Sequence, residues 1–174
     1  MEENILEIVE KSCRIYRDVI AVKYLSHREI VEKSYGDMWD DIRKTAVILR
    51  NNGLCGTHIA LVGSSSYEWI CAYMAILFTG NTAVPLDANL SVSELHELLN
   101  RSGSIALFCG ASRKDVITEL TDDCPEMNIV FTMEKKVDIE HLEGADSNPQ
   151  LAILSFEQLR NEITIPDDFA FADQ

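Results

Sequence analysis

Three groups of residues in this sequence carry side chains that could do chemistry. The first is the loop Gly63-Ser64-Ser65-Ser66, which follows an apolar run of strand length and precedes a long apolar helical run. Such loops bind phosphate in α/β proteins, because the free backbone N–H groups of a helix start point at the ligand. This loop has neither the GxGxxG spacing nor the lysine of a GxxxxGK[ST] loop. Helix capping therefore explains these serines better than phosphate binding does.

The second group contains possible metal ligands, namely the histidines and the acidic pair Asp40-Asp41. The third group is again the loop serines, now considered as nucleophiles of a hydrolase. Asp40 and Asp41 are adjacent, but both fall on the polar side of an expected helix, where we expect them to face solvent. The serines lack the G-x-S-x-G pattern of a hydrolase. The histidines form neither a pair four residues apart nor an HExxH motif; they are His27, His58, His96 and His141. These residues alone therefore indicate no catalytic constellation and no metal site.

The elements that must position these residues begin with a central strand–helix–strand unit. His58–Val62 and Thr82–Leu86 are apolar runs of strand length, and residues 69–78 between them are apolar without a break. Ser65, with Glu68 three residues later, predicts a capping box at the start of the helix. Units of this kind are right-handed crossovers between parallel strands. Because the helix has no polar face, we expect almost complete burial of Trp69, Met74 and Leu77.

Helices and strands alternate over the rest of the chain. Residues 4–16 have the pattern of an amphipathic helix, and residues 19–25 and 29–33 suit a hairpin. Further strands are predicted at residues 105–109 and 128–132, with helices that open near Ser34, Ser91, Ser112 and Ser155. This alternation predicts an α/β fold with a mostly parallel, doubly wound sheet flanked by helices and a short N-terminal hairpin.

The boundaries follow from the same patterns. Residues 1–162 form one α/β domain, in which the polar residues 134–150 are an exposed loop. Residues 163–174 have no helical or strand period, so they are interpreted as a tail.

Composition restricts the classes of function. The formal net charge of −14 and the isoelectric point near 4.6 argue against a nucleic acid or an anionic membrane as partner. The five cysteines are odd in number and form no CxxC pair, which favours a reducing cytosol over a disulfide framework or a zinc site. The N-terminus is acidic, unlike a signal peptide, and the longest apolar run is about half of a membrane span. We expect a cytoplasmic protein without a membrane span.

Three stretches of the sequence match patterns of one enzyme family. Residues 34–38 (SYGDM) resemble the motif [TS]-Y-x-E-L, with Asp37 and Met38 in place of Glu and Leu. Residues 77–87 (LFTGNTAVPLD) resemble L-K-A-G-x-A-Y-V-P-[IL]-D, with departures at Asn81, Thr82 and Ala88. Between them, the segments IALV and SYEW are similar to the family's VAI…NSPEW stretch. In their order and separation, from about Asn4 to Leu159, these stretches resemble the adenylate-forming enzymes: acyl-CoA synthetases, luciferases and peptide-synthetase adenylation domains.

The resemblance implies the N-terminal part of a ligase with a two-step reaction, most similar to fatty acyl-CoA synthetases. In that family a carboxylate attacks the α-phosphate of Mg-ATP to give an acyl-adenylate, and a thiol, commonly that of coenzyme A, then takes the acyl group. The family's phosphate loop with its lysine, the adenine motif, the ribose-binding aspartate and the catalytic lysine follow a segment like residues 166–172 (PDDFAFA), and none is present here.

Three expectations follow from the resemblance. The full-length enzyme uses ATP, Mg and CoA with its carboxylate, whereas this chain alone is inactive and holds none of these cofactors. The tail at 163–174 leads to the missing nucleotide-binding region. The turn formed by Asp87, Ala88 and Asn89 lies near the coenzyme A side of the family's cleft and is the predicted binding site, with a purely structural turn as the alternative.

Other hypotheses remain open. The chain could be a free-standing, non-catalytic α/β binding or interaction module. A receiver-like signalling domain fits less well, since the strand at 105–109 is not followed directly by the lysine that such a domain needs. The tail carries Ile163, Ile165, Phe169 and Phe171, and we expect it to be disordered, or ordered only by a second copy in a weak homodimer.

Overall fold

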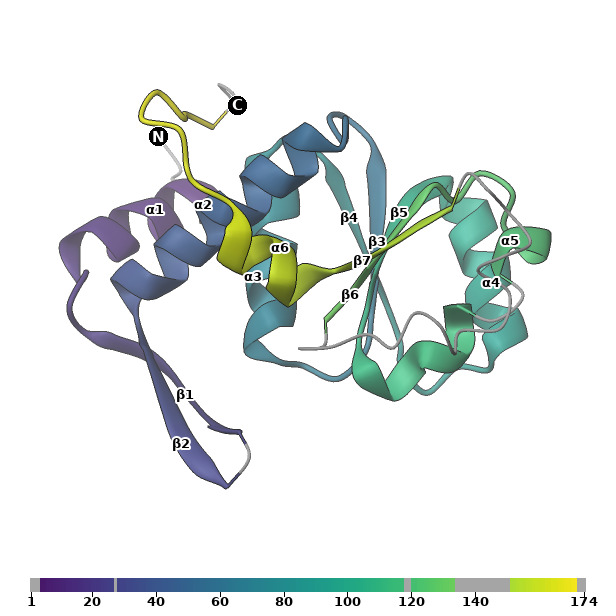
Figure 1. The fold of residues 1–174 in the computed structure, drawn as a ribbon, viewed down its shortest axis with the longest axis horizontal. Coiled ribbons are helices and arrows are strands. Elements are labelled where there is room, and N and C mark those ends of the chain that lie inside the picture. Colours follow the sequence, from purple (N-terminus) through teal and green to yellow (C-terminus); the bar gives the residue numbers. More distant parts are fainter. Residues whose placement is uncertain (1–3, 27, 118–119, 134–150, 172–174) are drawn as a thin grey trace.

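Three layers make up the main body of the protein in the computed structural model, which describes residues 4–26, 28–117, 120–133 and 151–171. A five-stranded parallel sheet lies in the middle, in the order β4-β3-β5-β6-β7 (Figure 1). Its strands are β3 (His58–Val62), β4 (Thr82–Leu86), β5 (Ser104–Cys109), β6 (Ile129–Thr132) and β7 (Ala152–Ser155). The predicted mostly parallel α/β sheet is therefore confirmed.

Helices cover both faces of the sheet (Figure 1). One face carries α2 (Tyr35–Asn51), α3 (Tyr67–Phe78) and α6 (Phe156–Glu162). The other face carries α4 (Val92–Ser102), the 3₁₀ segment η1 (Ala111–Ile117) and α5 (Leu120–Asp123). Each face has its own hydrophobic core, so the sheet is buried on both sides, as parallel sheets require.

The N-terminal part of the chain lies outside these three layers. Helix α1 (Ile5–Ile15) packs on α2, and β1 (Ile20–Ser26) pairs antiparallel with β2 (Glu29–Ser34). The hairpin projects away from the sheet (Figure 1). Both the predicted first helix and the predicted hairpin are confirmed.

Polar side chains start most of the helices, as their sequence patterns predict. Ser34 caps α2 and Ser91 caps α4, each in a reciprocal capping box with the acid three residues later. Helix α3 starts one residue later than predicted, because its N-cap is Ser66, whose hydroxyl accepts a hydrogen bond from the backbone N–H of Trp69 at 3.1 Å. The prediction of Ser65 as that N-cap was therefore wrong.

The residues of α3 that were predicted to be almost completely buried are not the ones that are buried. Trp69, Met74 and Leu77 are only partly buried. The fully buried side of α3 carries smaller residues together with Ile76; its members are Cys71, Ala72, Ala75 and Ile76. Small side chains let the helix approach the sheet and α2 closely. Since every residue at 69–78 is apolar, the sequence period could not identify the covered side.

Two elements of the second half differ from the prediction. The helix predicted from Ser112 to about Asp122 is broken, because Arg113 has non-helical dihedrals (φ −130°, ψ 31°) inside η1 and a separate short helix, α5, follows. Strand β7 was not predicted, since only four residues form it and Ile153 is its single buried member. The loop predicted at 134–150 lies outside the described residues.

The tail packs against its own domain. The ring of Phe171 lies 4.6 Å from that of Phe78 and 5.4 Å from that of Trp39, measured between centroids, and Phe169 lies under the guanidinium of Arg50 at 4.7 Å. Figure 1 shows this segment running past α1 and α2. The expectation that residues 163–171 are disordered or need a second copy to become ordered was therefore wrong.

Candidate functional site at the carboxyl edge of the sheet

The strand order places a topological switch point between β3 and β5. From β3 the chain passes through α3 to β4 on one side, and from β4 it returns through α4, on the opposite face, to β5 on the other side of β3. The chain therefore leaves β3 and β5 toward helices on opposite faces of the sheet. In open α/β sheets, ligands bind at such a switch point, outside the carboxyl ends of the strands. Val62 and Cys109, the last residues of the two strands, are register partners, so both loops start at the same level.

Two glycines lie at this switch point, directly after β3 and β5. Gly63 has φ +140°, and a Cβ on it would lie 2.9 Å from the Cα of Gly110. The N–H of Gly110 donates a hydrogen bond to the carbonyl of Val62 at 2.8 Å. The backbones of the two loops are thus in direct contact, which only glycine permits.

The loop of residues 63–66, which carries three serines, begins at this contact. Ser66 is used as the N-cap of α3, whereas Ser64 and Ser65 are exposed and their hydroxyls make no hydrogen bond within the described part of the chain. Two hydroxyls and the N-terminal N–H groups of α3 can therefore donate to a polar or anionic group at this edge. Capping accounts for one of the three serines.

The predicted turn lies at the end of the neighbouring strand, β4. Oδ1 of Asp87 accepts hydrogen bonds from the backbone N–H and from Nδ2 of Asn89, both at 2.9 Å. The N–H of Leu90 donates to the carbonyl of Asp87 at 3.3 Å. This is an Asx turn, so the Asp87 carboxylate stabilises its own loop. Asp87 and Asn89 are exposed at the edge of the sheet.

Arg113, which the sequence analysis missed, holds this turn in place. Its Nη1 donates to the carbonyls of Ala88 at 2.7 Å and Leu90 at 2.9 Å, and only 8% of the residue is exposed. Its Nε and Nη2 each lie 3.0 Å from a carboxylate oxygen of Asp115. The hydrogen bonds from Arg113 hold the pKa of Asp115 below its ordinary value. Nothing in the local sequence distinguishes Arg113 from other basic residues.

Three loops therefore meet or lie next to one another at one edge: residues 63–66, 87–90 and 110–113. They offer backbone N–H groups and hydroxyls to a ligand. They also contain the buried Arg113, whose N–H groups already donate to Asp115 and to the 87–90 turn. The described residues contain no group of three potential metal ligands among His, Cys, Asp and Glu. Such an edge can bind a polar group, but no general base or nucleophile in it is positioned by a partner.

The sequence analysis expected Asp41 to face solvent, and this expectation was wrong. Its side chain is only 13% exposed, and its Oδ2 accepts a hydrogen bond from the hydroxyl of Tyr67 at 2.7 Å. Lys33 and Arg160 lie 3.4 and 3.8 Å from the same oxygen. Burial, together with the negative charge of Asp41, raises the pKa of Tyr67. Charge compensation makes this cluster a structural link between β2, α2, α3 and α6.

Cys71 lies next to this polar cluster without taking a chemical role. Burial raises the pKa of its thiol to about 12, so the thiol is protonated and unreactive.

The described histidines are likewise structural. His96 is 3% exposed; its Nδ1 lies 2.6 Å from Oδ2 of Asp123, and its Nε2 donates to the carbonyl of Val116 at 2.8 Å. His58 contacts the carbonyl of Ser102. His27 and His141 lie outside the described residues.

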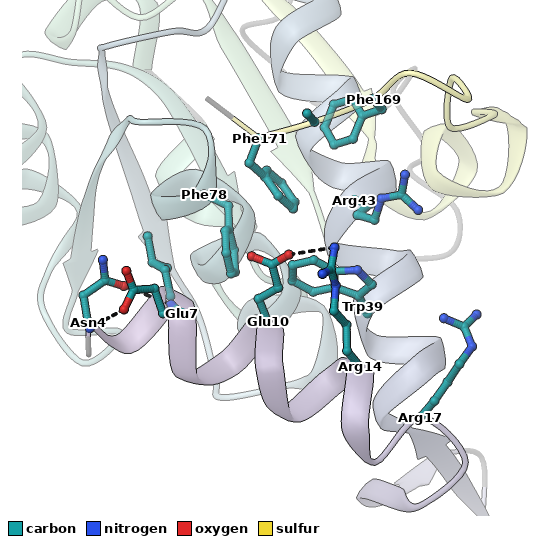
Figure 2. Close-up of a pocket in the computed structure, with 12 residues that line it drawn as sticks. Asn4, Glu7, Glu10, Arg14, Arg17, Trp39, Arg43, Phe78, Phe169 and Phe171 are labelled. Atoms are coloured by element: carbon teal, nitrogen blue, oxygen red, sulfur yellow. Dashed lines mark hydrogen bonds and ion pairs between the residues drawn. The ribbon is translucent and has the colours of Figure 1, made fainter. Parts of the chain in front are cut away.

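A groove lies apart from the carboxyl edge, between α1, α2 and the tail (Figure 2). Its volume is about 600 Å³, and its aromatic side is formed by Trp39, Phe78 and Phe171. Two arginines at its rim are in ion pairs: Arg14 with Glu10 at 3.1 Å and Arg17 with Asp40 at 3.0 Å. None of the predicted site residues lines this groove.

No helix within the described ranges is both long enough and apolar enough to cross a membrane.

Known proteins similar to this chain include ligases and synthetases. A model of the AMP-binding enzyme family matches residues 9–172. The acyl-CoA ligase cnsG of Penicillium expansum is 25% identical over 105 residues, which is 60% of this chain and 21% of that protein. The hybrid PKS-NRPS synthetase apdA of Emericella nidulans is 32% identical over 90 residues, 51% of this chain and 2% of that protein.

The fold is also similar to solved structures. Coronafacic acid ligase from Pectobacterium brasiliense superposes with a TM-score of 0.79 at 22% identity, over 98% of this chain and 31% of that one. The anthranilate CoA ligase AuaEII, solved with anthranoyl-AMP, gives 0.77 at 16% identity, over 97% and 30%. The chain thus spans about a third of these structures and about a fifth or less of the curated relatives above. Because the family match covers nearly all of it, the chain belongs to the AMP-binding enzyme family and has the fold of an N-terminal part of the adenylate-forming enzymes.

Proposed function

We propose that this chain is the N-terminal part of an ATP-dependent ligase that activates a carboxylate as an acyl-adenylate and transfers the acyl group to the thiol of coenzyme A. The family match over residues 9–172 carries this proposal. Two relatives support the choice of coenzyme A as acceptor: the acyl-CoA ligase cnsG, and the 3-[(3aS,4S,7aS)-7a-methyl-1,5-dioxo-octahydro-1H-inden-4-yl]propanoyl:CoA ligase of Rhodococcus jostii. A cytoplasmic location remains a prediction.

The chain alone is proposed to be inactive. Transfer at the α-phosphate of ATP develops charge that a lysine, a metal ion and backbone donors must neutralise. The sequence contains no GxxxxGK[ST] loop, and the carboxyl edge offers no lysine; its one arginine, Arg113, already donates to Asp115 and to the 87–90 turn. ATP and Mg are therefore assigned to the nucleotide-binding part of the complete enzyme.

The turn Asp87-Ala88-Asn89 keeps its proposed role as a contact on the coenzyme A side. Its exposed position and its rigid backbone, held by Arg113 and by its own Asx turn, support that role. Rigid exposed backbone binds a ligand with little ordering cost. A purely structural turn is the competing interpretation.

Two assays on the purified 174-residue chain test the proposed inactivity. We expect no carboxylate-dependent exchange of pyrophosphate into ATP, and calorimetry should find no ATP binding tighter than the millimolar range, about −4 kcal/mol. A complete adenylate-forming ligase serves as the positive control. Adenylate formation by the purified chain well above the blank would show that it is a complete catalyst and would refute the proposal.

A free-standing binding module is the second candidate. One observation favours it: Phe169 and Phe171 pack on side chains of their own domain. Such a module would bind its ligand at the carboxyl edge without transforming it.

A further inference from the structure

The buried ring of His96 connects α4 to the two elements that follow β5. The residue is only 3% exposed, and its ring contacts η1 at the carbonyl of Val116 and α5 at the carboxylate of Asp123. Figure 1 shows α4 and α5 on the same side of the sheet. All of these groups belong to this chain and meet inside the domain, so their contacts can be interpreted without any further protein.

Both ring nitrogens of His96 face an oxygen that accepts hydrogen bonds. Nδ1 lies 2.6 Å from Oδ2 of Asp123, and Nε2 lies 2.8 Å from the carbonyl oxygen of Val116. A carbonyl and an ionised carboxylate have no hydrogen to donate. A neutral imidazole has one N–H group, so it would satisfy one oxygen and direct a nitrogen lone pair at the other. The imidazolium has two N–H groups and satisfies both.

Two other arrangements of the protons fit these contacts less well. If the ring were rotated by 180°, carbon atoms would face both oxygens and both hydrogen bonds would be lost. A protonated Asp123 could donate to the ring, but 51% of its side chain is exposed, so water stabilises its ionised form. The geometry therefore favours a positively charged ring beside a negatively charged carboxylate.

Asp123 is the counter-charge that this ring contacts. Of the two strands that pack on α4, β4 has no ionisable residue, and β5 has Cys109, whose thiol donates to the carbonyl of Arg113. The thiol of Cys124 donates to the backbone carbonyl of His96 at 3.6 Å. Burial chiefly raises the pKa of this thiol to about 11, so it carries no charge at neutral pH.

The remaining charged residues on α4 and η1 are engaged elsewhere or lie along the same elements. On η1, Arg113 pairs with Asp115, and Lys114 lies between them in the sequence. The charged residues of α4 near the ring are Glu94, which accepts from Ser91, and Glu97, which pairs with Arg101. At the end of α4, His58 of β3 contacts the carbonyl of Ser102.

The contacts of His96 hold a segment that reaches the carboxyl edge of the sheet. Helix α5 has only four residues, and α4 holds it through His96 and through Asn100, whose Nδ2 donates to the carbonyl of Asp123 at 2.6 Å. The 3₁₀ segment η1, which His96 contacts at Val116, also carries Arg113, the residue that binds the 87–90 turn. The state of the ring is therefore connected to that turn through one short segment.

We propose that His96 is a buried imidazolium whose two N–H groups attach η1 and α5 to α4, and that loss of one of these protons to solvent releases the segment. When the ring is neutral, one attractive contact becomes a repulsion between a lone pair and an oxygen. The stabilisation is thus present while the ring is charged and is lost as the pH rises through its deprotonation. This device is independent of the ligase reaction.

NMR of the purified, ¹⁵N-labelled chain tests the charge of the ring. At about pH 7 we expect both ring nitrogens of His96, assigned from its backbone signals, to carry a proton. A His96 ring with a single N–H group at this pH would overturn the proposal. This measurement uses the wild-type chain and requires no variant to fold.

Hydrogen exchange tests the release of the segment. The backbone N–H groups of Cys124 and Met127 donate to carbonyls at 2.8 and 3.0 Å, so they report on α5 and the turn after it. Raising the pH until His96 loses a proton should lower their protection factors about tenfold or more, because a hydrogen bond to a charged group is lost. The N–H of Thr82, which donates to Thr57 away from this segment, should keep its protection factor.

Two variants complete the test, with circular dichroism to show that each is folded. His96→Gln should have low protection at Cys124 and Met127 at every pH, because its side chain does not ionise. His58→Gln is the matched control, since it removes an imidazole that contacts the end of α4, and it should keep the wild-type pH dependence. Protection at Cys124 and Met127 that stays constant while the wild-type ring loses its proton would overturn the proposal.

Discussion

At the scale of single residues, the carboxyl edge depends on positions whose roles are local and steric. Gly63 and Gly110 allow two loops to touch, and Arg113 fixes a third loop by its hydrogen bonds. The sequence identified Gly63 by its position after a strand, and the turn Asp87–Asn89 through the family resemblance. It could not identify Arg113, because its partners are carbonyl groups about two dozen residues away, and carbonyl groups carry no sequence signal.

Gly63→Ala tests the close contact at this edge. The substitution forces a Cβ to within 2.9 Å of Gly110, at a φ of +140° that only glycine adopts easily, so we expect a loss of about 3 kcal/mol or more in unfolding free energy. Gly53→Ala is the matched control: φ is +71° and nothing lies within 4 Å, so about 1 kcal/mol is expected. Equal losses in urea unfolding would show that the two loops do not need their contact.

The ion pair of Asp115 with Arg113 predicts a dependence on pH. Because the folded pKa of Asp115 is lowered, chiefly by its hydrogen bonds with Arg113, its stabilisation is fully present above the unfolded pKa of about 3.9. That stabilisation is lost as the pH falls through the folded value. Asp115→Asn should therefore be less stable than the wild type near neutral pH, and the difference should disappear in acid.

Thermal unfolding between about pH 7 and pH 2.5 measures this difference, with Glu97→Gln on the exposed side of α4 as the control for removal of a carboxylate. A gap between the wild type and Asp115→Asn that stays constant over this range would refute the role of the ion pair.

At the scale of elements, the sequence predicted those with strong local patterns. Strands β3 and β4 have the predicted bounds, and Ser34, Ser91 and Ser155 cap the helices that they were expected to cap. The errors arose where the pattern was uniform or short. Every residue in most of α3 is apolar, β7 has only four residues, and the kink at Arg113 follows from its tertiary hydrogen bonds.

The orientation of α3 predicts that truncating two adjacent residues will destabilise the fold by different amounts. Ile76 is completely buried, whereas Leu77 is only partly buried. Ile76→Ala should therefore cost about 2–5 kcal/mol of unfolding free energy, and Leu77→Ala about half of that or less. Urea unfolding of both variants measures the two losses, and a larger loss at Leu77 would mean that α3 is rotated from the orientation described.

At the scale of the whole molecule, the fold class and the family were predictable because they follow from the order of elements and from three motifs. The packing of the tail was not, since residues 163–171 have no period and are ordered by rings distant in sequence. The same limit applies to Asp41, which periodicity placed on a polar face and which α6 buries through Arg160. Contacts between distant segments are decided by the assembled fold.

The central claim is that this chain is the N-terminal part of an adenylate-forming ligase. The sequence of the messenger RNA beyond the codon for Gln174, obtained from the source organism, tests it most directly. We expect the reading frame to continue, with a Ser/Thr- and Gly-rich loop ending in Pro-Lys within roughly twenty residues. A stop codon directly after Gln174, or a continuation without such a loop, would contradict the claim and favour the free-standing binding module.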